Sequence, residues 1–207
     1  MRVVLPDLGL SNLASARRAL EALGHEPVVT GDPEVVAAAR LIVLPGVGAF
    51  GEAMRRLAET GIGDAIREAA AAGAGVVGIC LGMQLLFDAS EEGDTEPGLG
   101  LIPGRVVRLA GDAPVPHVGW NRVCATPRGA PLFGDADGCD FYFVHSYVAR
   151  PEDPSVIAAR CLHGEQFVAA VAAPRRVGFQ FHPEKSGSEG VRLLGRALEA
   201  AGEGGLA

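Results

Sequence analysis

The sequence has little lysine, no paired cysteines and no excess of positive charge. Lys185 is the single lysine, and 25 acidic residues against 18 basic ones give a net charge of −7. Nucleic-acid and anionic-membrane surfaces need clustered Lys and Arg, so we expect neither partner. The four cysteines form no Cys-x-x-Cys spacing, which argues against a zinc site or a redox pair, and we expect no metal.

The sequence also shows no pattern typical of a secretory signal or a membrane-spanning helix. Residues 1–7 have no apolar signal-peptide core and predict a buried first strand. Residues 69–87 are apolar enough for a membrane span, but Gly73, Gly75, Gly78 and Gly82 interrupt them and no Trp or Tyr flanks them. We therefore expect a reduced, cytoplasmic protein with no membrane contact.

Apolar runs alternate with helical patterns through the first half of the chain. Strands are predicted at residues 3–5, 27–30, 41–44 and 76–79. Helices are predicted at 12–23 with Ser11 as cap, shortly after Asp32, and at 50–59, 63–72 and 83–87. Nearly continuous apolar strands separated by helices are typical of a parallel sheet covered on both faces. The predicted class is a doubly wound, mainly parallel α/β fold.

After Gly93 the chain changes to short apolar runs separated by Pro and Gly. Strands are predicted at 105–109, 118–123, 141–148, 156–161, 167–171 and 177–181, and their close spacing predicts an antiparallel extension of the sheet. Ser186 and Glu189 have capping-box spacing for a last helix that ends near Ala201. Without a linker or repeat, we expect one domain over residues 1–201 and a frayed tail at 202–207.

The most informative motif is Gly-Ile-Cys-Leu-Gly at residues 78–82, between a predicted strand and a predicted helix. A residue at such a sharp turn takes a strained backbone, and the flanking glycines let the strand and helix approach. The Cys80 thiol then lies at a helix N-terminus, which favours its reactive thiolate, and the Leu81 N–H is available as an oxyanion donor. Most free cysteines are inert core residues, so this hypothesis requires a base.

Residues 46–51 fit the dinucleotide pattern G-x-G-x-x-G after a strand. The acidic residue expected about 20 positions later is Glu68, which lies inside a helical pattern, so we expect no nucleotide cofactor. A turn at a strand's carboxyl end fits better, with N–H groups at Val47 and Gly48 as further oxyanion donors. Glycines on both sides of Val47 allow its peptide to turn toward the site or away from it.

The candidate base is His182, which follows an apolar run and precedes Pro183 and Glu184. A carboxylate two residues on can hold one imidazole nitrogen while the other faces a thiol. Together with Cys80 this predicts a triad in the order Cys, His, Glu. The other histidines are assigned a structural or solvated role by default: His25, His117, His145 and His163.

These two motifs together resemble the triad glutamine amidotransferases: Gly-Ile-Cys-Leu-Gly-Met-Gln at 78–84 and Phe-His-Pro-Glu at 181–184. Segments 45–50, 117–121, 142–147 and 181–186 further resemble the glutaminase subunits of imidazole glycerol phosphate synthase. The likeness spans almost the whole chain. Residues 7–12 match that family's Asp-Tyr-Gly-x-x-Asn except that Leu8 replaces the aromatic residue.

The resemblance implies L-glutamine hydrolysis through a thioester, with ammonia passed to a cyclase partner in histidine synthesis. The partner is expected on another chain, as a (β/α)₈ barrel in a heterodimer. By matched position, the glutamine-binding residues are Gln84, Glu92, His145 and Ser146. Candidate interface residues are Asn12, Trp120, Asn121, Tyr142 and Lys185.

Three alternatives stay open. A glutaminase of anthranilate or phosphoribosylformylglycinamidine synthesis is disfavoured by the segments at 45–50 and 117–121. A cysteine peptidase or chaperone-like protein on a similar sheet is disfavoured by the pairing of His182 with Glu184. A non-catalytic binding subunit is disfavoured by the intact set of Cys80, His182 and Glu184, and a glutaminase assay with the partner present separates it.

Overall fold

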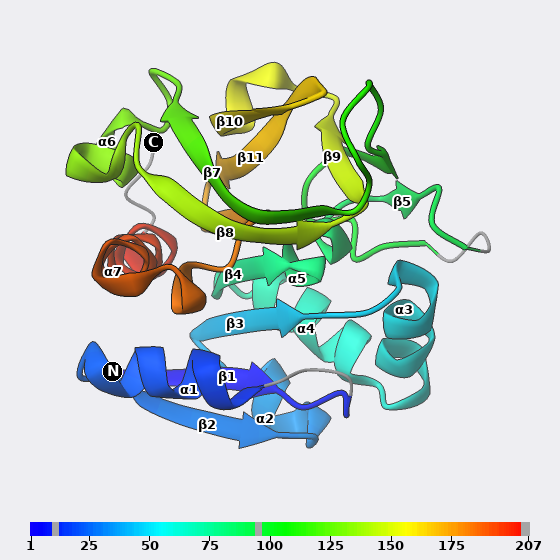
Figure 1. The fold of residues 1–207 in the computed structure, drawn as a ribbon. Helices are drawn as coiled ribbons and strands as arrows, with labels where there is room; N and C mark the ends of the chain where they lie inside the picture. The colour runs from blue at the N-terminus through cyan, green and yellow to red at the C-terminus, as the bar shows by residue number, and fades with distance from the viewer. Residues whose placement is uncertain (10–12, 94–96, 204–207) are drawn as a thin grey trace.

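The computed structural model describes residues 1–9, 13–93 and 97–203 (Figure 1). The first half contains β1 (Arg2–Pro6), α1 (Leu13–Ala22), β2 (Glu26–Thr30), α2 (Pro33–Ala37), β3 (Leu41–Gly46), α3 (Phe50–Glu59), α4 (Ile62–Ala71), β4 (Gly75–Cys80) and α5 (Leu81–Leu85). The second half contains β5 (Ala89–Ser90), β6 (Gly104–Arg108), β7 (His117–Ala125), α6 (Ala130–Phe133), η1 (Gly134–Ala136), β8 (Asp140–His145), β9 (Tyr147–Pro151), η2 (Pro154–Val156), β10 (Ile157–His163), β11 (Glu165–Ala173), β12 (Arg176–Phe179), η3 (Pro183–Lys185) and α7 (Gly187–Glu203).

Within the described ranges, the main sheet has nine strands in the order β2-β1-β3-β4-β12-β11-β10-β7-β8. The pairs from β2 to β12 are parallel, and the pairs from β12 to β8 are antiparallel. In Figure 1 the parallel strands β2, β1, β3 and β4 rise in that order from the bottom of the view. The predicted α/β fold with an antiparallel extension is confirmed, and β12 is the strand at which the two parts meet.

β3 and β4 are apolar throughout, and β1 is apolar after Arg2, because both faces of these strands are covered. Val3 and Leu5 of β1 belong to the same buried cluster as Leu20 of α1 and Leu194 of α7. Val4, between them, belongs to the opposite cluster, which also contains apolar residues of α2, α3, α4 and α5. Successive strand side chains point to opposite faces, so the strands lose the polar alternation of a one-sided sheet.

One predicted strand is wrong: the run 141–148 is two strands in two different sheets. β8 pairs with β7 in the main sheet, whereas β9 pairs with β6 in a three-stranded sheet of order β5-β6-β9. Ser146 lies between them, and its carbonyl accepts a hydrogen bond from the Leu109 N–H at 2.9 Å. The chain therefore changes partner strand at Ser146, where no Gly or Pro marks a break.

The last helix extends beyond its predicted end and lacks the predicted capping box. The Ser11 cap of α1 lies outside the described residues. The last helix, α7, continues to Glu203, so Gly202 is helical rather than frayed. The Ser186 hydroxyl does not make the predicted capping box: it donates to the His182 carbonyl at 2.7 Å and accepts from the Tyr142 N–H at 3.0 Å.

Residues 69–87 contribute to α4, β4 and α5 rather than to one long helix. In the part of the chain that the structure describes, every helix is too short or too polar to cross a membrane. The apolar stretch is explained by burial on both faces of the sheet.

Candidate active site

Cys80 ends β4 and begins the turn into α5, with backbone angles φ 55° and ψ −112°. A positive φ is unfavourable for any residue with a Cβ, so the surrounding structure must hold this conformation. Glycine is required on both sides: a Cβ on Gly78 would lie 2.6 Å from the Gly82 carbonyl oxygen, and one on Gly82 would lie 1.6 Å from that of Leu44. The predicted strained turn and its two glycine contacts are confirmed.

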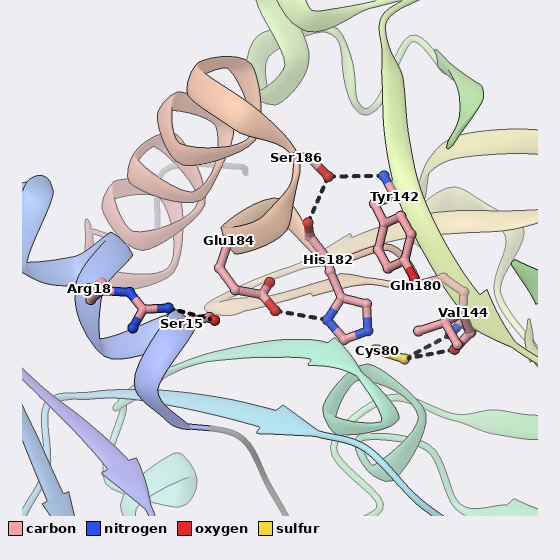
Figure 2. Close-up of polar contacts among 9 residues, drawn as sticks. All are labelled: Ser15, Arg18, Cys80, Tyr142, Val144, Gln180, His182, Glu184 and Ser186. Atoms are coloured by element: carbon pink, nitrogen blue, oxygen red, sulfur yellow. Dashed lines mark hydrogen bonds and ion pairs between the residues drawn. The ribbon is translucent and has the colours of Figure 1, made fainter. Parts of the chain in front are cut away.

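His182 and Glu184 form a buried pair beside Cys80. The His182 Nδ1 lies 2.8 Å from Glu184 Oε1, and the two side chains are only 2% and 5% exposed. The other ring nitrogen, Nε2, is buried, has no hydrogen-bond partner among the described residues, and faces the Cys80 sulfur (Figure 2). Burial lowers the pKa of His182, but its interactions with Cys80 and Glu184 outweigh that effect and raise it to about 9.

The backbone of η3 fixes the direction of this pair. Ser186 bonds the His182 carbonyl and the Tyr142 N–H, and the His182 N–H donates to the Tyr142 carbonyl at 2.9 Å. The His182 backbone is therefore anchored to β8 directly at its N–H and through Ser186 at its carbonyl, and Figure 2 shows the link through Ser186. Such support is what a general base needs to keep its geometry through a reaction.

A cavity of about 170 Å³ opens in front of the Cys80 sulfur. It is lined by Val47, Gly48, Cys80, Leu81, Gln84, Glu92, Val144, His145, Ser146 and Tyr147. All the residues predicted to donate to an oxyanion or to bind glutamine are in this set. The structure thus brings together positions from the turn after β3, from α5, from β8 and from the segment after β5.

Glycine is required on the two sides of Val47 for different physical reasons. A Cβ on Gly46 would lie 2.9 Å from the Leu81 Cβ, so Gly46 permits close contact between β3 and α5. Gly48 has φ 109° and open space around it, so it is needed for its backbone conformation. Conformational freedom therefore belongs to Gly48 and not to Gly46.

Glu92 is tied to the same segment. Its Oε2 accepts a hydrogen bond from the Phe50 N–H at 3.0 Å, at the first residue of α3, and its own N–H donates to Ser90 Oγ at 3.0 Å. A carboxylate at a helix N-terminus is stabilised by the unpaired N–H groups there. Glu92 thus places a negative charge on the cavity wall, and it bonds to Phe50, two residues beyond Gly48.

His145 lines the cavity, but both of its ring nitrogens bond within the protein. Its Nδ1 lies 2.9 Å from the Tyr147 carbonyl, and its Nε2 lies 3.0 Å from His117 Nδ1. Burial lowers the pKa of His145 to about 3 and that of His117 to about 4, so both are neutral at pH 7. His163 stacks on His117, yet the described residues hold no group of His, Cys, Asp and Glu that could bind a metal.

The sequence matches the class-I glutamine amidotransferase family model over residues 4–199. The chain belongs to this family. It is 48% identical over 194 residues to the imidazole glycerol phosphate synthase subunit HisH of Symbiobacterium thermophilum, with 93% of this chain and 91% of that protein covered. It is 45% identical over 195 residues to the subunit of that name from Aquifex aeolicus, with 94% of each covered. The sequence-based assignment to HisH-type glutaminase subunits is confirmed.

Solved structures support the fold of this glutamine amidotransferase independently. A crystal structure described as glutamine amidotransferase superposes with a TM-score of 0.75 at 23% identity, covering 97% of this chain and 98% of the other. The PurLQS structure from Thermotoga maritima superposes with a TM-score of 0.70 at 22% identity, covering 96% and 97%. At such low identity the likeness concerns the fold alone.

The predicted interface residues of the amidotransferase that the structure describes lie on β7, β8 and η3. Trp120 of β7 is 59% exposed and packs edge-on against Tyr142 of β8, with ring centroids 6.2 Å apart. Lys185 is exposed in η3, whereas the Asn121 amide donates within the protein, to the Leu162 carbonyl at 3.0 Å. Asn12 lies outside the described residues.

Sequence reasoning missed three residues that contact this site. Val144 accepts from the Cys80 thiol through its carbonyl at 3.7 Å, the Gln180 amide nitrogen lies 3.9 Å from the same sulfur, and the Tyr147 carbonyl accepts from Gln84 at 3.0 Å. Gln180 alone had a signal, because a polar side chain between Phe179 and Phe181 is unusual at a strand end. The two carbonyl contacts depend on strand order and leave no mark in the sequence.

Proposed function

We propose that Cys80, His182 and Glu184 carry out the hydrolysis of L-glutamine in this chain. The observation that carries the proposal is the buried, unpartnered His182 Nε2 that faces the Cys80 sulfur while Glu184 holds the opposite nitrogen. A base oriented by a carboxylate and directed at a nucleophile is the arrangement that acyl transfer requires.

The reaction begins with the proton of the Cys80–His182 pair on His182, whose pKa is raised to about 9, and the Cys80 sulfur attacks the side-chain amide carbon of glutamine. N–H groups of Leu81 and of the Val47–Gly48 segment stabilise the oxyanion that forms. The His182 imidazolium then protonates the leaving nitrogen, which departs as ammonia and leaves a thioester on Cys80. Water activated by His182 hydrolyses the thioester to glutamate and restores the thiol.

The cavity suits a free amino acid better than a peptide. Its volume of about 170 Å³ is small, and the Glu92 carboxylate offers a counter-ion for an α-ammonium group. Gln84 and the segment at Ser146 also belong to the cavity wall and supply its remaining polar contacts. His145 shapes that wall rather than bonding the ligand, since its ring nitrogens are occupied.

The ammonia acceptor is proposed to be the cyclase subunit, a (β/α)₈ barrel, in a cytoplasmic heterodimer with the amidotransferase domain of residues 1–201. β7 and β8 present two cross-strand pairs next to the cavity, Val118 with Val144 and Trp120 with Tyr142. Val118 is 57% exposed, and Val144 is both 37% exposed and a lining residue of the cavity. An apolar cover over this surface would keep ammonia from being protonated in water, and aromatic residues of this kind are typical of binding hot spots.

The experiment concerns Gly48, whose N–H is proposed to face the site in one peptide orientation and to turn away in the other. We expect low ammonia release from the chain alone, and higher release from the complex with the cyclase and its nucleotide. Gly48→Pro removes the N–H and cannot adopt the positive φ, so glutamine-dependent turnover falls. Loss of one oxyanion donor costs about 2.7–4 kcal/mol, a hundred- to thousandfold in rate.

The control is the reaction of the same mutant complex with free ammonia, which stays near the wild-type rate if assembly is intact. Equal kcat in the isolated chain, the complex and the nucleotide-bound complex would rule out an activating peptide turn. Wild-type glutaminase activity in Gly48→Pro would show that this segment does not contribute to the oxyanion hole.

A further inference from the structure

Gln180 is a fully buried amide that contacts the candidate nucleophile. It lies directly after β12, and its N–H donates to the Ala169 carbonyl at 2.9 Å, which fixes its backbone against β11. Its side-chain nitrogen lies 3.9 Å from the Cys80 sulfur, which Figure 2 shows between His182 and Gln180. None of the steps derived above uses this side chain.

The orientation of the Gln180 amide is dictated by its neighbours. The Tyr147 carbonyl can only accept, so the Gln84 group 3.0 Å from it must be the NH₂ group. The same NH₂ group lies 3.0 Å from Gln180, which must therefore present its oxygen to Gln84. The Gln180 NH₂ group is then left to face the Cys80 sulfur.

The histidine pair strengthens this constraint from the other side. The Tyr147 carbonyl also accepts from His145, so His145 carries its proton on Nδ1 and offers a lone pair on Nε2. His117 must donate to that lone pair, and its own Nε2 then accepts from the Asn121 amide at 3.2 Å. The proton of each hydrogen bond from Asn121 through His117 and His145 to Tyr147 is thereby assigned. These bonds hold the Tyr147 carbonyl in place.

We propose that Gln180 is a further catalytic residue, which donates an N–H to the sulfur of Cys80 when the sulfur is a thiolate. In the thiol form the S–H points to the Val144 carbonyl, 3.7 Å away. Once the proton has moved to His182, that carbonyl can no longer accept from the sulfur, and Gln180 and His182 become its two donors. Hydrogen bonds to an anion are stronger than those to a neutral acceptor, so Gln180 favours the state that attacks.

This inference rests on the proposed role of Cys80, and the test separates the two. Cys80 is alkylated with iodoacetamide at several pH values, its modification is followed by peptide mass spectrometry, and kcat and KM for glutamine are measured in the complex. Gln180→Met keeps the length of the side chain and removes the donor. We expect alkylation at pH 7 and kcat each to fall about tenfold or more, with alkylation moved to higher pH and KM changed less.

Gln180→Glu replaces the donor with an oxygen and is expected to have a larger effect than Gln180→Met. The matched control is Gln166→Glu, which makes the same change at an exposed position of β11 and should behave as wild type. Thermal unfolding shows whether each variant is folded. A folded Gln180→Met with the wild-type pH dependence of alkylation and wild-type kcat would overturn the proposal.

Should Gln180→Met fail to fold, Gln180→Asn provides the second test. It retains the amide but withdraws it from the sulfur by one methylene, and it is expected to slow alkylation in the same direction. Unchanged alkylation in folded Gln180→Asn would also overturn the proposal. Glutaminase activity that persists in Cys80→Ala would instead refute the role of Cys80, whatever the Gln180 variants do.

Discussion

Two buried histidine environments meet near Cys80 and have opposite acid-base behaviour. Burial lowers the pKa in both, yet His182 has its pKa raised to about 9 while that of His145 is lowered to about 3. The difference lies in the partners: His182 faces a carboxylate and a thiol, whereas His145 faces a backbone carbonyl and a neutral imidazole. Burial alone does not make a histidine catalytic, because a charged partner is needed to keep its proton near neutral pH.

The two environments also differ in what they leave open. Every nitrogen of His145 is bonded, while the Nε2 of His182 is buried and unbonded among the described residues. An unsatisfied buried polar atom costs stability and persists where function uses it. The hydrogen bonds of His145 and His117 thus fix each ring in one tautomer at the cavity wall, whereas the Nε2 of His182 is left available for the reaction.

Removal of the Cys80 sulfur should have the largest effect. Cys80→Ala is expected to abolish glutamine hydrolysis, because the nucleophile is lost, and to lower the pKa of His182 while leaving that of His145 unchanged. Ammonia release and the titration of both histidines by NMR test this. Reaction of the complex with free ammonia serves as the control for assembly, and substantial glutaminase activity would show that another group attacks.

The second-largest effect is expected when a histidine of each environment is replaced by Asn, because the two variants should differ in activity. His182→Asn is expected to be nearly as damaging as Cys80→Ala, since the base and the proton donor disappear together. His117→Asn, equally buried, should retain activity within about tenfold, because it acts only through neighbouring groups. Steady-state kcat at matched folded fractions decides, and equal losses in the two variants would contradict the distinction.

A change in charge at Glu184 should have an intermediate effect. Glu184→Gln keeps an oxygen for the His182 Nδ1 but removes the negative charge, so the pKa of His182 should fall and kcat should drop less than in His182→Asn. A loss of about ten- to a hundredfold is expected, in line with a charged hydrogen bond that becomes neutral. A loss greater than that of His182→Asn, or no loss, would refute the orienting role.

The pH dependence of stability should show the smallest effect, with opposite signs in the two environments. The raised pKa of His182 means that it contributes stability below about pH 6.5, which is lost as pH rises toward about 9. The lowered pKa values of His117 and His145 mean that their contribution is present above about pH 6.5 and is lost as pH falls toward 4 and 3.

Denaturant unfolding from pH 4 to pH 9 measures both limbs, each on the order of 1–3 kcal/mol. Glu184→Gln should flatten the alkaline limb only, and His117→Asn the acidic limb only. If either variant flattened both limbs, the two environments would not be independent.

Short-range patterns in the sequence predicted the parts of the site that depend on neighbouring residues. The strained turn at Cys80 follows from glycines two positions away, and the pairing of His182 with Glu184 follows from a spacing of two residues. The boundaries of α3 agreed with the pattern because a helix imposes its period on the residues within it. Oxyanion and glutamine positions were taken from the family resemblance, and the structure gathers them around one cavity.

Contacts between distant segments could not be obtained in this way. The run 141–148 contains no Gly, Pro or acidic or basic residue other than His145, so it does not mark the change of sheet at Ser146. Gln180 meets Cys80 only because β12 pairs with β4. The bond between His145 and His117 likewise forms only because β7 pairs with β8. The local conformations could be read from the sequence, because backbone sterics and periodicity set them. Which polar atoms face one another depends on the tertiary structure, because strand order brings them together and periodicity does not encode strand order.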